Sequence, residues 1–326
     1  MTELAKLQDG EEQVRLAALA ELLKGEGSLA QAVPVVAERL NDPSEDVRKL
    51  AVLVLERAEA SAIPALAPAL DEKQPTSVRI LAASALAKAG QNATPAINPL
   101  CACLLSHDGT LRWHAAFALG KIGASAVPAL QVALRSADPE VLCAVADALG
   151  WIGSGAQAVL DDLKRLASSS APLPVRLACH SALVKISGDA SAGLPMLLAT
   201  LKEKDPIGRA SALERIGHLR TMARESAPML LPYLADSSGE VRAAAALALG
   251  RIEATTPETI EALTCVLADL EPDARANAGI ALASMGAAAE PALPALRVMR
   301  RATAPRLAAI AKAAVERISK QAQPVK

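Results

Sequence analysis

The sequence predicts an all-α fold, a right-handed α-solenoid of about ten stacked helix pairs. The first observation is an arginine that recurs at intervals of 33, 31, 33, 64, 33, 33, 33 and 31 residues, where the long interval spans two units because Leu142 replaces one arginine. Repeats of about 30 to 45 residues cannot bury their apolar faces alone and therefore stack on their neighbours. The recurring residues are Arg15, Arg48, Arg79, Arg112, Arg176, Arg209, Arg242, Arg275 and Arg306.

The second observation is an apolar stripe on the helix that carries each arginine. When Leu111 is numbered position 1, positions 1, 5, 8, 9 and 12 fall on one face of a helix. In the fourth repeat these positions hold Leu111, Ala115, Ala118, Leu119 and Ile122. We call this the first helix of each repeat and expect its stripe to face the core.

The third observation is the punctuation between segments. Glycine at position 13 (Gly123, Gly153, Gly286) suits a left-handed cap at the end of the first helix. A proline then opens the second, antiparallel helix, since the first turn of a helix does not need that N–H; these prolines are Pro34, Pro64, Pro95, Pro128, Pro195 and Pro228. A further proline inside some second helices predicts a kink, at Pro68, Pro99, Pro232 and Pro294.

Composition limits the function classes. The 326 residues are 52% hydrophobic and 1% aromatic, so alanine and leucine must form the core. A net charge of −1 disfavours a dedicated nucleic-acid binder. We expect no secretory signal, no membrane span, and five reduced cysteines buried in a cytoplasmic protein. Residues 1–326 are expected to form a single solenoid with an irregularity near 155–175, where small residues and prolines gather.

The repeated pattern Asp-Pro-x-Val-Arg-x-x-Ala-x-x-Ala-Leu-Gly-x-Ile-Gly, followed by Ala-x-Pro-x-Leu, resembles HEAT repeats. Its short period and its Ala-Leu-Gly-x-Ile-Gly core are similar to the subclass named after phycobilin lyases. The resemblance implies that the first helices line a concave face. It also implies a ladder between the arginines and the acids three residues before position 1, which are Asp108, Asp138, Asp205 and Glu271.

Positions 3, 7 and 11 of the first helix point away from the stripe and should line the concave face. In repeat four they are Trp113, Phe117 and Lys121, and in repeat five Cys143, Asp147 and Trp151. Three of the four aromatic residues of the chain fall here, which predicts a binding patch; the alternative is that the superhelix buries them as core filler. Position 11 is often basic, which indicates either an anion-binding row or cations that stabilise helix ends: Lys24, Arg57, Lys88, Lys121, Lys185, His218 and Arg251.

Catalytic motifs are scarce. The histidines lack the paired glutamates of HEAT-like iron hydroxylases, and neither a phosphate-binding loop nor a nucleophile elbow occurs. No metal or other cofactor is expected, and the chain is not expected to be an enzyme.

The sequence therefore predicts a scaffold that binds an extended or helical segment of another protein on its concave face. Trp113, Phe117 and Trp151 would anchor the segment, and Lys121, Asp147 and Lys185 would set the polarity of the rim. The alternative is a bilin lyase or chromophore-handling subunit. In that case the aromatic rings would stack on the tetrapyrrole, the two lysines would pair with its propionates, and Asp147 would accept from pyrrole N–H groups.

Overall fold

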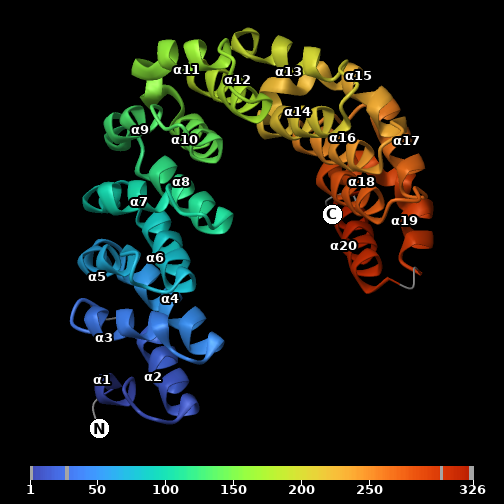
Figure 1. Cartoon of the computed structure of the whole chain (residues 1–326). Coiled ribbons are helices and arrows are strands. Elements are labelled where there is room, and N and C mark those ends of the chain that lie inside the picture. The colour runs from blue at the N-terminus through green and yellow to red at the C-terminus, as the bar shows by residue number, and fades with distance from the viewer. Residues whose placement is uncertain (1–2, 26–28, 302–303, 323–326) are drawn as a thin grey trace. The chain divides into compact units, whose positions relative to one another are not determined.

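The structure is a computed structural model that describes residues 3–25, 29–301 and 304–322. Throughout these ranges the regular secondary structure is helical, and no strand occurs (Figure 1). Ten first helices follow one another: α2 (Glu12–Lys24), α4 (Glu45–Ala58), α6 (Thr76–Ala89), α8 (Gly109–Ile122), α10 (Pro139–Ile152), α12 (Leu173–Ser187), α14 (Pro206–His218), α16 (Gly239–Arg251), α18 (Pro272–Met285) and α20 (Pro305–Ala322). The predicted all-α solenoid of about ten repeats is confirmed.

The second helices are shorter and are often preceded or followed by 3₁₀ turns. Nine of them lie between the first helices in the described part of the chain, and the short α1 (Glu3–Lys6) precedes α2. They are α3 (Val33–Glu38), α5 (Ile63–Leu66), α7 (Ile97–Cys103), α9 (Val127–Ala133), α11 (Leu160–Ala167), α13 (Leu194–Thr200), α15 (Ala227–Leu230), α17 (Pro257–Val266) and α19 (Leu293–Met299).

Contacts within the chain define two compact units, Met1–Leu163 and Lys164–Lys326. Each unit has the same construction, in which consecutive first helices pack side by side, as α6 does on α8 and α16 on α18. Near the boundary, Ala156 has non-helical backbone angles of −102° and 18°, and residues 168–172 form a link without helix. A single continuous solenoid over residues 1–326 stays a prediction.

The core is made of the residues that the stripe predicts. Leu111, Ala115, Ala118, Leu119 and Ile122 are all at most 1% exposed. From α4 to α18 the apolar residues at positions 1, 5, 8 and 9 are buried as well, so the burial of apolar surface is spread over many repeats.

The turn after the first helix differs from the predicted left-handed cap. Gly123 has φ 85° and ψ −148°, and Gly153 has φ 66° and ψ −137°, whereas a left-handed helical residue has a ψ near +47°. The region that these residues occupy is accessible mainly to glycine. Glycine is therefore needed here for positive φ, as predicted, but the conformation is a different one because the chain must turn directly into a 3₁₀ segment.

The prolines occupy the helix starts in most repeats. Pro34, Pro64, Pro128, Pro195 and Pro228 lie in the first turn of their helices, whereas Pro95 lies in the 3₁₀ turn before α7. The predicted interruption occurs at Pro68 and Pro232, where α5 and α15 give way to 3₁₀ turns. It does not occur at Pro294, because this residue lies in the first turn of α19.

The recurring arginine has a structural role, but its predicted acidic partner was wrong. Asp108, Asp138 and Asp205 accept hydrogen bonds from backbone N–H groups and cap their own helices, and the side chain of Glu271 makes no such bond. In three repeats the arginine instead pairs with an aspartate 27 residues later, in the loop before the next first helix. The pairs are Arg15 with Asp42, Arg209 with Asp236, and Arg242 with Asp269.

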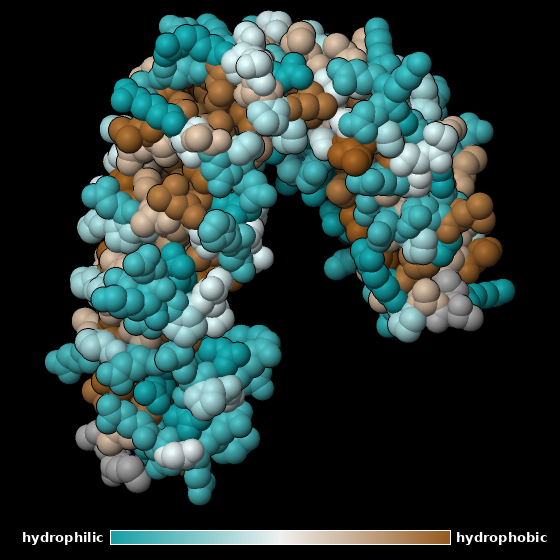
Figure 2. All heavy atoms as spheres, viewed as in Figure 1, coloured by the Kyte–Doolittle hydropathy of each residue, from teal (hydrophilic) through white to brown (hydrophobic). Residues whose placement is uncertain are grey.

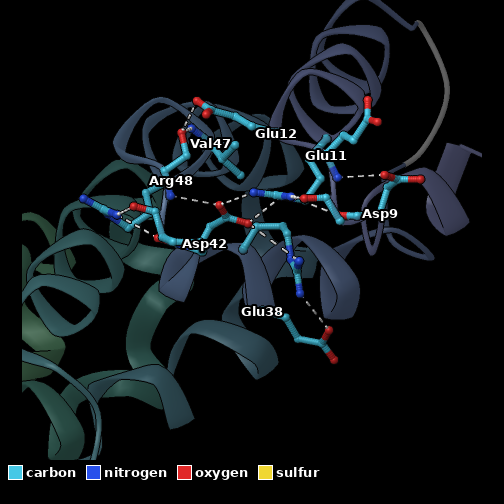
Figure 3. Close-up of polar contacts among 12 residues, drawn as sticks. Asp9, Glu11, Glu12, Glu38, Asp42, Val47 and Arg48 are labelled. Carbon is cyan, nitrogen blue, oxygen red and sulfur yellow. Dashed lines mark hydrogen bonds and ion pairs between the residues drawn. The ribbon is translucent and has the colours of Figure 1, made fainter.

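Six of the arginines also bind carbonyls in the loop that precedes their own helix: Arg15, Arg48, Arg112, Arg209, Arg242 and Arg275. Nη1 of Arg15 donates to the carbonyls of Asp9 and Gly10 at 2.9 and 3.0 Å, while Nε and Nη2 bind the two carboxylate oxygens of Asp42 at 2.8 and 2.9 Å. Figure 3 shows Asp42 at the centre of these contacts, with Arg48 repeating the pattern on the carbonyls of residues 42 and 43. Arg15 therefore connects the loop before its own helix to the loop of the next repeat, as Arg209 and Arg242 also do.

The ladder changes the pKa of its carboxylates. Burial by itself raises the pKa of Asp42, but the hydrogen bonds from Arg15 and the Ser44 N–H, together with nearby positive charge, outweigh burial and place the pKa below its usual value. The hydrogen bonds from Arg242 are the largest influence on Asp269 and lower its pKa.

We expect acid to weaken the fold through these pairs. A carboxylate whose pKa is lowered in the folded state stabilises the fold fully above its unfolded pKa, near 3.8, and this contribution is lost as pH falls through the lower folded value. Urea unfolding at pH 6, 4 and 3 should show stability falling below about pH 4. The Asp42→Asn variant should lose less stability over this interval than the wild type, and an equal loss in both proteins would contradict the assignment.

Two stretches, Pro139–Ala167 and Pro272–Met299, reach the length and mean hydropathy (1.2) of a membrane span, contrary to the expectation that none would. The reason is that both helices of an alanine-rich repeat contribute to one stretch. Each is interrupted by a glycine with positive φ, Gly153 or Gly286, and 44% of its most apolar window is buried inside the protein. In the corresponding pair α8 and α9 the two helices lie at 118° to each other.

The sequence suggested that all five cysteines are buried, but the structure buries only two of them. No disulfide joins any of the five; Cys103 and Cys179 are buried, Cys101 and Cys143 are half-buried, and Cys265 is exposed. Large apolar side chains are also exposed at scattered places, including Leu105, Val132 and Leu270. On the face seen in Figure 2 the apolar atoms accordingly form separate patches among hydrophilic ones.

Candidate protein-binding site

The aromatic residues of α8 and α10 form one cluster within the first unit. Trp113 and Phe117 are one turn apart on α8 and stack with their centroids 5.2 Å apart and their planes 7° apart. Trp151 of α10 stands edge-on to both, at 6.1 Å from Trp113 and 5.5 Å from Phe117. Such stacked and edge-to-face pairs are favourable geometries for aromatic rings. We call Trp113, Phe117 and Trp151 the aromatic patch.

The aromatic patch is accessible to solvent. Trp113 is 50% exposed, and Phe117 and Trp151 are half-buried. Core filler would be almost fully covered, as the stripe residues of the same helices are. A rigid, partly exposed aromatic group is therefore present on α8 and α10.

A glycine lets the two helices approach closely enough to form the patch. Gly120, at position 10 of α8, faces α10, and a Cβ added there would lie 2.8 Å from Cβ of Trp151. Since real Cβ atoms do not approach this closely, only glycine permits the present position of Trp151. The glycine of the Ala-Leu-Gly pattern thus serves helix contact, a role that the sequence analysis did not assign.

Two of the three polar residues predicted for the rim, Lys121 and Asp147, lie on the same helices as the aromatic patch. Nζ of Lys121 lies 5.2 Å from the centroid of the Phe117 ring, a cation–π contact. Asp147 is half-buried and lies one turn before Trp151 on α10, so these two residues share a side of the helix. Lys185 lies on α12, in the second unit, and is described with that unit.

One residue of the cluster was missed. His114 contacts Trp113 edge-on, with the ring centroids 4.9 Å apart, and burial lowers the pKa of its imidazole. Its position next to Trp113 in the sequence did not indicate a shared site, because consecutive residues point in different directions on a helix. At neutral pH it therefore adds a fourth, uncharged ring to the edge of the patch.

The basic residues at position 11 play more than one role. Nη1 of Arg57 donates to the carbonyls of Leu22 and Leu23 at 2.6 and 3.1 Å, at the C-terminal end of the preceding first helix. This agrees with the interpretation that such cations stabilise helix ends. Lys24, Lys88 and Lys121 are exposed, whereas Lys185, His218 and Arg251 are half-buried.

In the described ranges, no three His, Cys, Asp or Glu side chains form a group that could hold a metal ion. What α8 and α10 present is an apolar, aromatic surface bordered by a lysine and a carboxylate. Such a surface can bind through burial of rings and through cation–π or ionic contacts at its edge.

The fold and this surface define the class of an α-helical repeat protein with a partly exposed aromatic patch. A sequence profile of HEAT repeats matches residues 2–87, 97–184, 194–283 and 228–316. The chain belongs to the HEAT-repeat family. No curated protein matches it significantly.

Solved structures agree on the fold. A mutant of Kap121p shares 15% identity with this chain and has a TM-score of 0.53; Kap121p bound to Nup53p shares 13% with a TM-score of 0.52. In both cases the match covers 98% of this chain and 45% of the other, so the chain spans less than half of Kap121p. The complex of CpcE and CpcF of phycocyanin lyase from Nostoc matches at 21% identity over 74% of this chain and 94% of the other, with a TM-score of only 0.44.

Proposed function

We propose that the protein is a non-enzymatic interaction scaffold, and that the aromatic patch on α8 and α10 anchors an extended or helical segment of a partner protein. The observation that carries the proposal is the clustering of three of the four aromatic residues of the chain in one partly exposed group. Tryptophan and other large side chains near the centre of an interface supply most of its binding energy. Kap121p, which has a similar fold, was solved bound to Nup53p, so this fold is compatible with protein binding.

The rim residues give the proposed segment its polarity. Lys121, next to Phe117, would attract an acidic group, and Asp147, next to Trp151, would attract a basic one. A segment crossing from α8 to α10 with an acidic and then a basic residue would fit both charges. Five cysteines without a disulfide suit a reducing compartment, and we propose the cytoplasm as the location.

The geometry of the patch favours a peptide over a bilin. The plane of Trp151 makes angles of 76° with Trp113 and 83° with Phe117. A flat tetrapyrrole could therefore stack on one of these orientations only, whereas side chains of a peptide can pack against edges and faces alike. We accordingly propose the scaffold function alone.

Trp113→Ala should weaken partner binding by about 2 kcal/mol, or roughly 30-fold, because it removes a central aromatic anchor. Partners captured by the wild type would be identified, and their affinities measured by titration. Trp113 and Trp151 are the only tryptophans of the chain, so intrinsic tryptophan emission reports directly on the patch and should change on binding.

Leu105→Ala is a matched control because this side chain is 65% exposed but lies outside the patch. It should bind partners as the wild type does if binding is specific to the patch. Equal affinities for wild type and Trp113→Ala, or binding without any change in tryptophan emission, would rule out the aromatic patch as the binding site.

A further inference from the structure

A group of basic side chains gathers at the C-terminal ends of three neighbouring first helices in the second unit. Lys185 on α12, His218 on α14 and Arg251 on α16 share position 11, and Arg215 and Arg220 lie beside them. We call these five residues the basic cluster. An acidic neighbour is Glu214, whose Oε1 lies 4.0 Å from Nε2 of His218.

The charges of the basic cluster act on the pKa of His218. Burial lowers the pKa of His218 most, and the charges of Lys185, Arg251, Arg215 and Arg220 lower it further, to about 3. The imidazole is therefore neutral at neutral pH. It can still donate one ring N–H to a ligand.

Arg251 holds a buried hydrogen-bond donor that the protein does not use. Its Nη1 is buried and has no hydrogen-bond partner among the residues that the structure describes. Burial is also the largest influence on the Arg251 guanidinium and lowers its pKa. A buried, unpaired donor on a charged group is unfavourable, and native proteins rarely retain one without a reason.

Arg57 shows how the same position can be satisfied within the protein. It occupies position 11 on α4, and its Nη1 donates to the carbonyls 35 and 34 residues earlier, Leu22 and Leu23. For Arg251 the corresponding carbonyls belong to Ile216 and Gly217, in the tight turn that ends α14, where both accept the N–H of Leu219. Nη1 of Arg251 does not bind either of them.

We propose that the basic cluster binds an oxyanion, a carboxylate or phosphate group held by the guanidinium of Arg251 and assisted by the ring N–H of His218. Arginine suits this role because its planar guanidinium forms paired hydrogen bonds with carboxylates and phosphates. A bound oxyanion would supply the acceptor that Nη1 lacks. This site belongs to the second unit and does not depend on the aromatic patch.

The test is a titration of the full chain with inorganic phosphate and, separately, with a glutamate peptide. The imidazole resonance of His218, assigned by its loss in His218→Gln, should shift saturably with at least one probe. Arg251→Gln should weaken that binding at least tenfold, whereas Arg57→Gln should leave it unchanged because Nη1 of Arg57 already has protein acceptors. Tighter binding of phosphate would indicate a free or attached phosphate group, and tighter binding of the peptide a carboxylate.

Stability separates a binding role from a structural one. Arg251→Gln should melt at the same temperature as the wild type or higher, because it removes an unpaired buried charge. The proposal is overturned if neither probe shifts His218 saturably, or if Arg251→Gln binds as tightly as the wild type. Either result would leave the scaffold proposal for the first unit untouched.

Discussion

Asp42→Ala should destabilise the protein by about 3 kcal/mol or more, since it leaves a buried arginine without its counter-charge. The side chains of Arg15 and Asp42 are only 8% and 1% exposed. Asp42 also accepts the backbone N–H of Ser44 and lies 3.7 Å from Nη1 of Arg39. Urea unfolding at pH 7, followed by circular dichroism, would measure the change.

Asp273→Ala is the matched control for Asp42→Ala. Asp273 pairs with Arg306 at 2.9 Å, but their side chains are 60% and 70% exposed. An exposed pair of this kind contributes less than about 1 kcal/mol. Similar losses in both variants would contradict the view that burial, and not the ion pair as such, makes the ladder important.

Gly250→Ala should destabilise the protein by about 1 to 3 kcal/mol, although alanine is normally the better helix former by about 1 kcal/mol. Gly250 lies in the last turn of α16 and faces α18. A Cβ added there would lie 2.6 Å from Cβ and 2.7 Å from Cα of Ala281. Because one of these atoms belongs to the backbone, α18 itself would have to move. Thermal unfolding would measure the loss.

Gly109→Ala provides the comparison for Gly250→Ala. Gly109 opens α8, and the nearest atom to an added Cβ is the mobile end of the Arg112 side chain, at 3.6 Å. This variant should be as stable as the wild type or slightly more stable. If Gly250→Ala were equally well tolerated, the close contact between first helices would not be a requirement of the fold.

Much of the aromatic patch could be predicted from the sequence. Helical periodicity placed Trp113, Phe117 and Trp151 off the apolar stripe, and the 33-residue period placed α8 beside α10, so their proximity followed. The periodicity could not decide whether the rings were exposed, because exposure depends on how neighbouring helices pack. The role of Lys185 at the rim stays a prediction, since that residue belongs to the other unit.

The arginine ladder shows the same division. The sequence indicated that the arginine is structural, but the resemblance to HEAT repeats implied that its partner is the acid three residues before position 1, such as Asp108, which caps its own helix. The actual partner is an aspartate in the next loop, as Asp236 is for Arg209. A contact across 27 residues depends on the rise from one repeat to the next, and this rise is set by packing.

By itself the sequence determined the all-α repeat architecture, the buried stripe and the residues that lie off it, because these follow from local periodicity and from glycine and proline at fixed places. Only the tertiary structure decided which groups meet: the edge-to-face rings of the patch, the loop aspartates of the ladder and the unused donor of Arg251. These depend on side-chain positions in neighbouring repeats, as at Gly120, where one added carbon atom would lie 2.8 Å from Cβ of Trp151 and displace a ring of the patch.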